Sequence, residues 1–185
     1  MTPPQRKTQL CRRGFLATAA KITLCAGLAK PLKLHAAPVP SNKLKLFHIH
    51  TRERLELFDQ SLQAPEKHKR DLNSFLRDFR TGEVHPIDFR LMGILSKIQQ
   101  KTGSKGTYEV ISGFRSSATN AQLRASSNGV AKKSLHLVGQ AIDVRLTDLP
   151  TRDLRDVAIA LRLGGVGYYP KSDFVHIDTG RVRTW

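Results

Sequence analysis

Alternating apolar and polar positions mark the strands expected in this chain. Residues 44–50 alternate, and residues 55–58 resume the pattern after a short polar turn, so the two segments predict a β-hairpin. Other short apolar runs, bounded by glycine, serine or proline, predict the remaining strands. These lie at residues 108–111, 141–146, 166–169 and 174–178.

Apolar residues spaced three and four positions apart mark the helices. One helix is expected over residues 65–82, where a proline can open the first turn and a glycine can end the last. Further helices are expected over residues 87–101, 117–125 and 151–163. Because helices come earlier and strands later, the order favours an α+β fold, with a small, mainly antiparallel sheet flanked by helices.

The first 37 residues differ in composition from the rest of the 185-residue chain. They contain seven of the 31 basic residues, none of the 15 acidic residues and both cysteines. A basic segment ending at Arg13 precedes the moderately apolar residues 14–28, and a short stretch then ends in Ala36 and Ala37. This order is typical of a signal peptide, so we interpret residues 1–37 as a cleaved leader and residues 38–185 as one mature domain.

The leader resembles a twin-arginine export signal. Arg12-Arg13-Gly14-Phe15-Leu16 matches the pattern R-R-x-F-L, with Cys11 where serine or threonine is usual. A basic amphipathic helix is the alternative interpretation. The apolar run is shorter than the roughly 20 residues of a membrane span, so no stable membrane insertion is expected after export. From this signal we expect the mature protein in the periplasm.

The net charge of +16 favours a polyanionic partner, but the leader accounts for much of it. Nucleic acid is not expected as a partner, because the chain carries an export signal and lacks an aromatic-rich basic stripe. Without the leader the chain has no cysteine, which excludes disulfides and thiolate metal sites there. We expect the exported domain to be a monomer.

Three polar residues stand where strands should hold apolar ones: His136, Asp143 and His176. Gly139 permits a tight turn that can bring His136 and Asp143 together at the start of a strand. Two imidazoles and one carboxylate suit zinc, and three protein ligands leave a fourth position for water, as amide hydrolysis requires. Taken singly, each residue is more often a hydrogen-bonded buried histidine or aspartate, but the three together favour a metal site.

Three segments resemble the signatures of the zinc D,D-peptidase superfamily, which includes hedgehog-like domains. They are residues 111–116 (I-S-G-F-R-S), 134–143 (S-x-H-x-x-G-x-A-x-D) and 174–178 (F-V-H-I-D). Residues 164–170 add a closer resemblance to the murein endopeptidases that carry a twin-arginine signal. The resemblance spans residues 44–185. It implies the zinc D,D-peptidase fold, one zinc ion, and hydrolysis of the peptide cross-links of peptidoglycan during cell-wall remodelling.

The resemblance also implies roles for individual residues. His136, Asp143 and His176 would bind the zinc ion. Arg115 would lie in the active site and contact the substrate or its developing oxyanion. Ser112 and Ser134 would bind substrate or orient ligands, or act only as turn residues. Tyr169 would line the cleft or only pack there.

Two aspartates compete for the role of general base. Asp173 occupies the position, three residues before the last histidine, at which relatives commonly place a glutamate. Asp178 would project from the same strand face as His176, where it could activate water or merely orient that histidine. We favour Asp178 as the base and keep Asp173 as the alternative.

Rival functions use the same residues. A D,D-carboxypeptidase would trim terminal D-Ala with this site, and a non-catalytic cell-wall-binding domain would keep zinc as a structural metal. In the second case His48 or His50 would supply the fourth ligand, although such a pair is more often a solvated strand face. For an endopeptidase, both cross-links remain open: D-Ala to diaminopimelate, and diaminopimelate to diaminopimelate.

Overall fold

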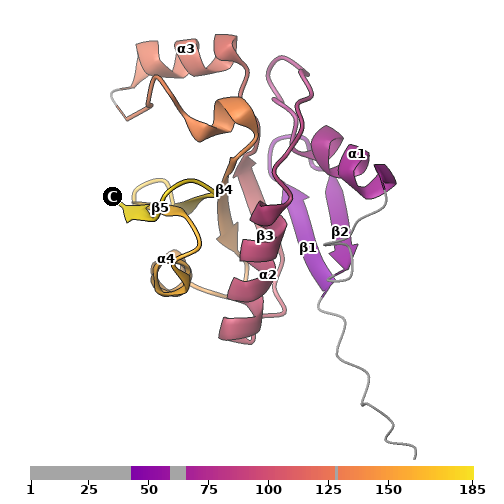
Figure 1. The fold of residues 1–185 in the computed structure, drawn as a ribbon, viewed down its shortest axis with the longest axis vertical. Coiled ribbons are helices and arrows are strands. Elements are labelled where there is room, and N and C mark those ends of the chain that lie inside the picture. Colours follow the sequence, from indigo (N-terminus) through magenta and orange to yellow (C-terminus); the bar gives the residue numbers. More distant parts are fainter. Residues whose placement is uncertain (1–42, 59–65, 128) are drawn as a thin grey trace, which may run out of the picture. The chain divides into compact units, whose positions relative to one another are not determined.

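The computed structural model describes residues 43–58, 66–127 and 129–185, so the predicted leader and Pro65 lie outside the described residues. Seven strands form one sheet in the order β2-β1-β3-β4-β6-β5-β7 (Figure 1). The strands are β1 (Lys43–His48), β2 (Arg54–Phe58), β3 (Tyr108–Ser112), β4 (Ala141–Leu146), β5 (Gly165–Tyr169), β6 (Phe174–Asp178) and β7 (Arg183–Thr184).

The sheet is mixed, which corrects the expectation of a small antiparallel sheet. β1 runs parallel to β3, and β5 runs parallel to β7, while the other neighbouring strands are antiparallel. A long connection containing two helices separates β1 from β3, and such a crossover is what parallel neighbours require. The α+β class itself is confirmed.

The helices lie close to their predicted positions but differ at their ends. They are α1 (Glu66–Phe75), α2 (Arg90–Thr102), α3 (Ser117–Ser126) and α4 (Thr151–Leu161), with a short 3₁₀ helix η2 (Leu135–Val138). α1 ends seven residues before the predicted Gly82, because Asp78 binds the backbone N–H groups of Arg80 and Ser116 and so favours a polar turn. α2 begins three residues late, after Asp88 accepts the N–H of Arg90.

The hydrophobic core lies on one face of the sheet, under α2 and α4. Val110, Val144 and Val175 form a fully buried row across β3, β4 and β6. α2 lies against this face, where the Tyr108 hydroxyl donates to the carbonyl of Leu95. Leu154 of α4 belongs to the same buried cluster. No helix among the described residues is long and apolar enough to cross a membrane.

The adjacent row across the sheet carries polar residues instead. Ser112, Asp143, His176 and Gly167 are successive cross-strand partners on β3, β4, β6 and β5. Because consecutive residues of a strand project to opposite faces, Asp143 and His176 point away from the valine row and its covering helices. The sheet therefore presents a polar row opposite the core.

Candidate metal centre

Backbone geometry brings the three predicted ligand residues together. Asp143 and His176 are direct partners on the antiparallel strands β4 and β6. His136 lies on η2, which ends at Gly139, where φ is +65°. This left-handed conformation favours glycine, and a Cβ atom there would lie 2.2 Å from the carbonyl oxygen of Pro86. Gly139 thus allows the chain to fold back and place His136 beside Asp143.

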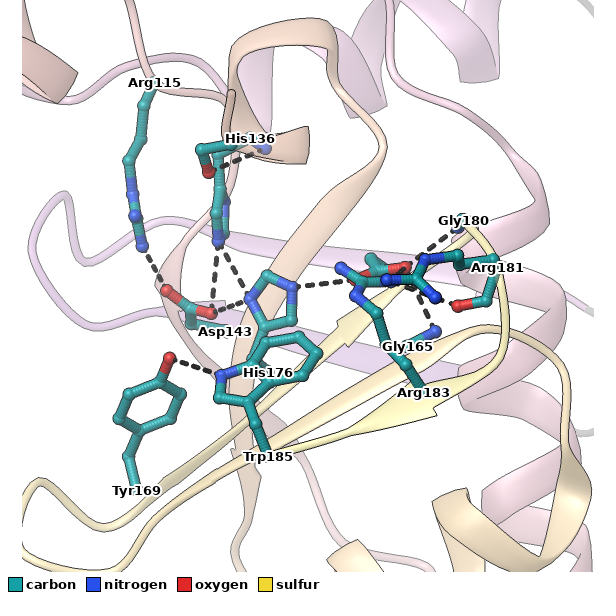
Figure 2. A network of polar contacts seen from close by, with 12 residues as sticks. Arg115, His136, Asp143, Gly165, Tyr169, His176, Gly180, Arg181, Arg183 and Trp185 are labelled. Atoms are coloured by element: carbon teal, nitrogen blue, oxygen red, sulfur yellow. Dashed lines mark hydrogen bonds and ion pairs between the residues drawn. The ribbon is translucent and has the colours of Figure 1, made fainter. Parts of the chain in front are cut away.

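The ligand atoms of these residues converge on one point (Figure 2). The Oδ1 atom of Asp143 lies 2.8 Å from Nδ1 of His176 and 3.2 Å from Nε2 of His136. The two imidazole nitrogens are 3.2 Å apart. All three side chains are buried, and they form a cluster able to hold a metal ion.

Contacts behind the two imidazoles favour metal binding. The Nδ1 atom of His136 lies 2.6 Å from the carbonyl oxygen of Gly113, and Nε2 of His176 lies 3.2 Å from Oδ2 of Asp178. Since these oxygens can only accept, each ring N–H faces away from the cluster and each lone pair faces into it. Two lone pairs and a carboxylate aimed at one point repel each other unless a cation lies between them. The donor set therefore fits a metal ion.

The ionisation states of two of the ligands also suit a metal. Burial lowers the pKa of His136, which keeps its imidazole neutral at neutral pH. Burial opposes the ionisation of Asp143, but His136 and His176 outweigh it and hold the pKa of that carboxyl below its usual range. Burial likewise opposes the charging of His176, yet hydrogen bonds to Asp143 and Asp178 raise its pKa. The ionised Asp143 and the neutral His136 are in the states that bind a cation, and His176 binds one in its neutral form.

Arg115 lies against the outer side of Asp143. One guanidinium nitrogen forms an ion pair with Oδ2 of Asp143, and Nε donates to the Ser112 hydroxyl at 2.8 Å. This pair leaves Oδ1 to the cluster. Ser134 acts locally, because its hydroxyl caps η2 by accepting the backbone N–H of His136 at 3.3 Å. Ser112 and Ser134 thus hold Arg115 and His136 in place.

Asp178 lies on the far side of the His176 ring from the cluster, because it meets Nε2 of that ring while Nδ1 faces Asp143. Its carboxylate accepts the backbone N–H groups of Gly165 and Gly180, at 3.0 and 2.8 Å, and pairs with Arg183 at 2.6 Å. Burial opposes ionisation, but these bonds hold the pKa of Asp178 below its usual range. The placement suits a residue that orients His176.

Asp173 lies outside the site. Its side chain is 61 % exposed and faces Arg145, and its carboxylate accepts the Thr151 hydroxyl at 2.8 Å. Its φ of +50° belongs to the turn between β5 and β6. Within the part of the chain that the structure describes, neither aspartate lines the cavity beside the cluster. The geometry therefore supports neither as a proton acceptor for water in that cavity.

A cavity of about 660 Å³ opens beside the cluster, with Arg115 and Tyr169 in its wall. Trp185 completes the wall in a way that sequence reasoning missed. Its indole N–H donates to the Tyr169 hydroxyl at 2.9 Å, and its ring lies 5.2 Å from that of His176. The ring occupies the space that a side chain at Gly167 would fill, with atoms 2.6 Å from an ideal Cβ. An unexplained glycine inside a strand was the available signal.

The two remaining candidate histidines, His48 and His50, lie in different surroundings. His48 is fully buried on the core face, edge-on to Phe75 and Phe79, so the expectation of a solvated face is wrong for it. Burial lowers its pKa to about 4. His50 lies in the cavity wall with its ring stacked on Phe79. Among the described residues, the candidate metal cluster contains neither of them.

Two imidazoles and a carboxylate converge at a cavity on the sheet of an α+β fold. This arrangement is typical of the centre of a metal-dependent hydrolase. Comparison with known proteins agrees. A peptidase M15 family model, described as "Peptidoglycan L,D-endopeptidase MepK", matches residues 36–185. The chain belongs to this family, within the zinc D,D-peptidase superfamily, and is a peptidoglycan endopeptidase.

Individual relatives match most of the chain. Peptidoglycan L,D-endopeptidase MepK of Escherichia coli (strain K12) is 44% identical over 144 residues, which is 77% of this chain and 79% of the relative. The Shigella flexneri protein of the same name matches equally well. A Haemophilus influenzae protein, named "Probable peptidoglycan L,D-endopeptidase MepK", is 48% identical over 115 residues, 62% of each chain.

Proposed function

We propose that this protein is a zinc-dependent L,D-endopeptidase that cuts the diaminopimelate–diaminopimelate cross-link of peptidoglycan. The observation that carries the proposal is the cluster of His136, Asp143 and His176, with three convergent ligand atoms beside a cavity. The relatives' name supplies the stereochemistry of the bond. An L,D bond joins an L-centre carbonyl to a D-centre amine. A D-Ala cross-link presents a D-centre carbonyl, whereas meso-diaminopimelate can present an L-centre carbonyl.

Three residues would hold zinc, and others would hold those ligands. His136, Asp143 and His176 supply nitrogen and carboxylate donors of the kind that zinc prefers. When bound, zinc supplies Lewis-acid chemistry, polarising the scissile carbonyl and making water more acidic. Asp178 orients His176 through its Nε2 atom, at 3.2 Å.

Arg115 would stabilise the negative charge that develops on the carbonyl oxygen. Its guanidinium is fixed by Ser112 and Asp143, so little reorganisation is needed as that charge forms. Tyr169, held by the indole N–H of Trp185, would contact the substrate backbone from the cavity wall.

Export to the periplasm is part of the proposal. The family match begins at residue 36, next to the predicted end of the leader, which supports a mature domain that starts near residue 38. The twin-arginine pattern at residues 12–16 supports export in the folded state. The mature protein would act as a monomer on peptidoglycan, without inserting into the membrane and without binding nucleic acid.

The proposal is tested on purified protein that has been loaded with one equivalent of zinc. Two dimeric muropeptides serve as substrates, one linked through two diaminopimelate residues and the other through D-Ala, with products identified by mass. We expect only the first to become monomers, and turnover to stop with EDTA or in His136→Ala. His85→Ala is the matched control, because His85 lies outside the cavity lining.

Other outcomes would replace the proposal. Cleavage of the D-Ala cross-link would change the assigned bond, and release of a terminal alanine would make the protein a carboxypeptidase. Tight zinc binding without turnover would favour a cell-wall-binding domain.

A further inference from the structure

Hydrolysis of an amide needs a group that takes a proton from water and returns one to the leaving amine. Asp178 lies behind His176, with its carboxylate already bound by five donors, and Asp173 lies outside the cavity. The candidate must therefore come from the cavity wall. Among the residues that the structure describes, the ionisable side chains that line it besides the cluster are Arg80, Arg115, Lys133, Arg183, Tyr169 and His50.

Five of these six side chains are poor proton acceptors. The arginines and the lysine are cations at neutral pH. The Tyr169 hydroxyl accepts the indole N–H of Trp185, which leaves it better placed to donate than to accept a proton. His50 alone combines a neutral form with a free lone pair on a ring nitrogen.

The backbone places His50 near the cluster. β1 and β3 run parallel with His48 opposite Val110, and the backbone N–H of Ile49 donates to the Val110 carbonyl at 3.1 Å. His50 therefore follows the end of β1 beside the end of β3, where Ser112 pairs with Asp143. His50 and the three residues of the cluster line the same cavity. A water molecule in that cavity can therefore lie between the imidazole and the carbonyl of a bound substrate.

Local contacts fix the His50 ring. It stacks on Phe79 with centroids 4.1 Å apart and planes 12° from parallel. The backbone N–H of His50 donates to Nδ1 of His48 at 3.3 Å. Neither ring nitrogen of His50 forms a hydrogen bond to any residue within the described ranges, so both are available to water or substrate. The ring is positioned by packing and keeps its polar edge free.

The electrostatic surroundings keep the imidazole basic but unprotonated. Burial and the neighbouring guanidinium of Arg80 lower the pKa of His50. Among the described residues, the titratable groups next to the ring are Arg80, from the segment after α1, and His48, from β1. The Arg80 guanidinium opposes a second positive charge, while His48 is itself kept neutral by burial. A neutral imidazole near pH 7 is the form that can accept a proton.

We propose that His50 is the general base and then the general acid of this peptidase, a role that rests on the proposed function. A lone pair of its imidazole takes one proton from water as the oxygen of that water bonds to the scissile carbonyl carbon. The carbon–nitrogen bond then breaks, and the imidazolium gives the same proton to the leaving amine. One water is consumed, a carboxyl group and an amine are formed, and His50 returns to its neutral form.

The test compares His50→Gln with His85→Gln. His85 also stacks on a phenylalanine, Phe114, at 4.7 Å, but lies outside the cavity lining. With the diaminopimelate-linked dimer, we expect His50→Gln to lower kcat about 100-fold or more, with KM changed by less than about threefold. His85→Gln should keep the wild-type rate. Zinc content and the melting temperature should be the same in all three proteins.

Two further measurements separate a base from a structural residue. The acidic limb of the wild-type pH profile of kcat/KM should be lost in His50→Gln. In His50→Ala, added imidazole should restore the rate, because the vacated space over Phe79 accepts a free imidazole. These readouts would not respond to a residue that only packs against Phe79.

Contrary results have distinct meanings. A His50→Gln protein with wild-type kcat and an intact acidic limb would exclude His50 as the base. Loss of zinc from that variant would make His50 a ligand and also overturn the proposal. A wild-type protein that binds zinc but cuts no cross-link would instead overturn the proposed function, and the role of His50 with it.

Discussion

The molecule contains two pairs of histidines with nearly the same mutual geometry and different chemistry. The rings of His136 and His176 have centroids 5.0 Å apart and planes inclined by 66°, and those of His48 and His50 are 5.9 Å apart and inclined by 60°. The first pair shares Asp143, while the second pair packs on Phe79 and is beside Arg80. Closeness of two imidazoles therefore does not define a metal site.

The acceptors around each pair make the difference. Carbonyl and carboxylate oxygens behind His136 and His176 hold both N–H groups away from the centre. In the second pair, Nδ1 of His48 accepts backbone N–H groups from His50 and Thr51, which uses the lone pair that a metal would need. The first arrangement favours a cation, and the second favours a neutral buried ring.

Removing the shared carboxylate is expected to have the largest effect on this comparison. Asp143→Asn keeps the side-chain shape but removes the negative charge between His136 and His176. We expect loss of stoichiometric zinc binding and a fall in turnover of about a thousandfold or more. Metal content after dialysis, together with muropeptide cleavage, provides the measurement. Full zinc content in Asp143→Asn would show that the two imidazoles suffice.

The buried histidine of the second pair predicts a pH dependence of stability. The pKa of His48 is about 4 in the folded protein, against 6.5 when exposed. Between these values the unfolded chain binds more protons, so the free energy of unfolding falls as the pH falls from 6.5 to 4, by about 3 kcal/mol in total. His48→Phe should remove this part of the pH dependence, as measured by urea unfolding at several pH values. An unchanged slope would contradict the prediction, and His85→Phe is the control.

Substitution of Asp178 is expected to affect zinc binding by the first pair less than substitution of Asp143. Asp178→Asn weakens the hydrogen bond that orients His176 and leaves Arg183 without its buried carboxylate partner. We expect a 10- to 100-fold loss of zinc affinity or turnover. Asp173→Asn is the matched control and should stay within about threefold of wild type, because that side chain is exposed outside the cavity. Equal losses in the two variants would remove the distinction between these aspartates.

The smallest effect is expected from Gly167→Ala. The added Cβ would displace the Trp185 ring from its place beside His176, which we expect to cost about 1 kcal/mol in stability. The tryptophan fluorescence spectrum and the melting temperature together report the change. Gly129→Ala is the control, since a Cβ there meets nothing within 4 Å. A spectrum that matches wild type would show that the ring does not depend on Gly167.

The three-residue cluster could be predicted because its signals are local in the sequence. Gly139 lies between His136 and Asp143 in a short motif, and the family signature adds His176. The core-facing strand residues could be predicted from alternation for the same reason. The parallel pairing of β1 with β3 could not, because it depends on a crossover between residues more than 60 positions apart.

Other errors arose where a side chain, and not the periodicity, decides the structure. α1 ends early because Asp78 forms a polar turn with the backbone of a distant segment. The strand pattern correctly placed Asp178 near His176, but it could not tell which edge of the imidazole the carboxylate would meet. Trp185 and His50 reach the cavity from opposite ends of the described chain, and no spacing rule links them.

The pairing of Asp143 with His176 across β4 and β6 has a consequence for folding fidelity. Side chains alternate along a strand, so a slip of one residue would turn one ligand toward the core and bring an apolar neighbour such as Val144 or Val175 into its place. A sheet with the wrong register would then lack a metal site. Metal binding would stabilise only correctly paired molecules. The ion would in this way select the correct strand register, in addition to its role as a cofactor.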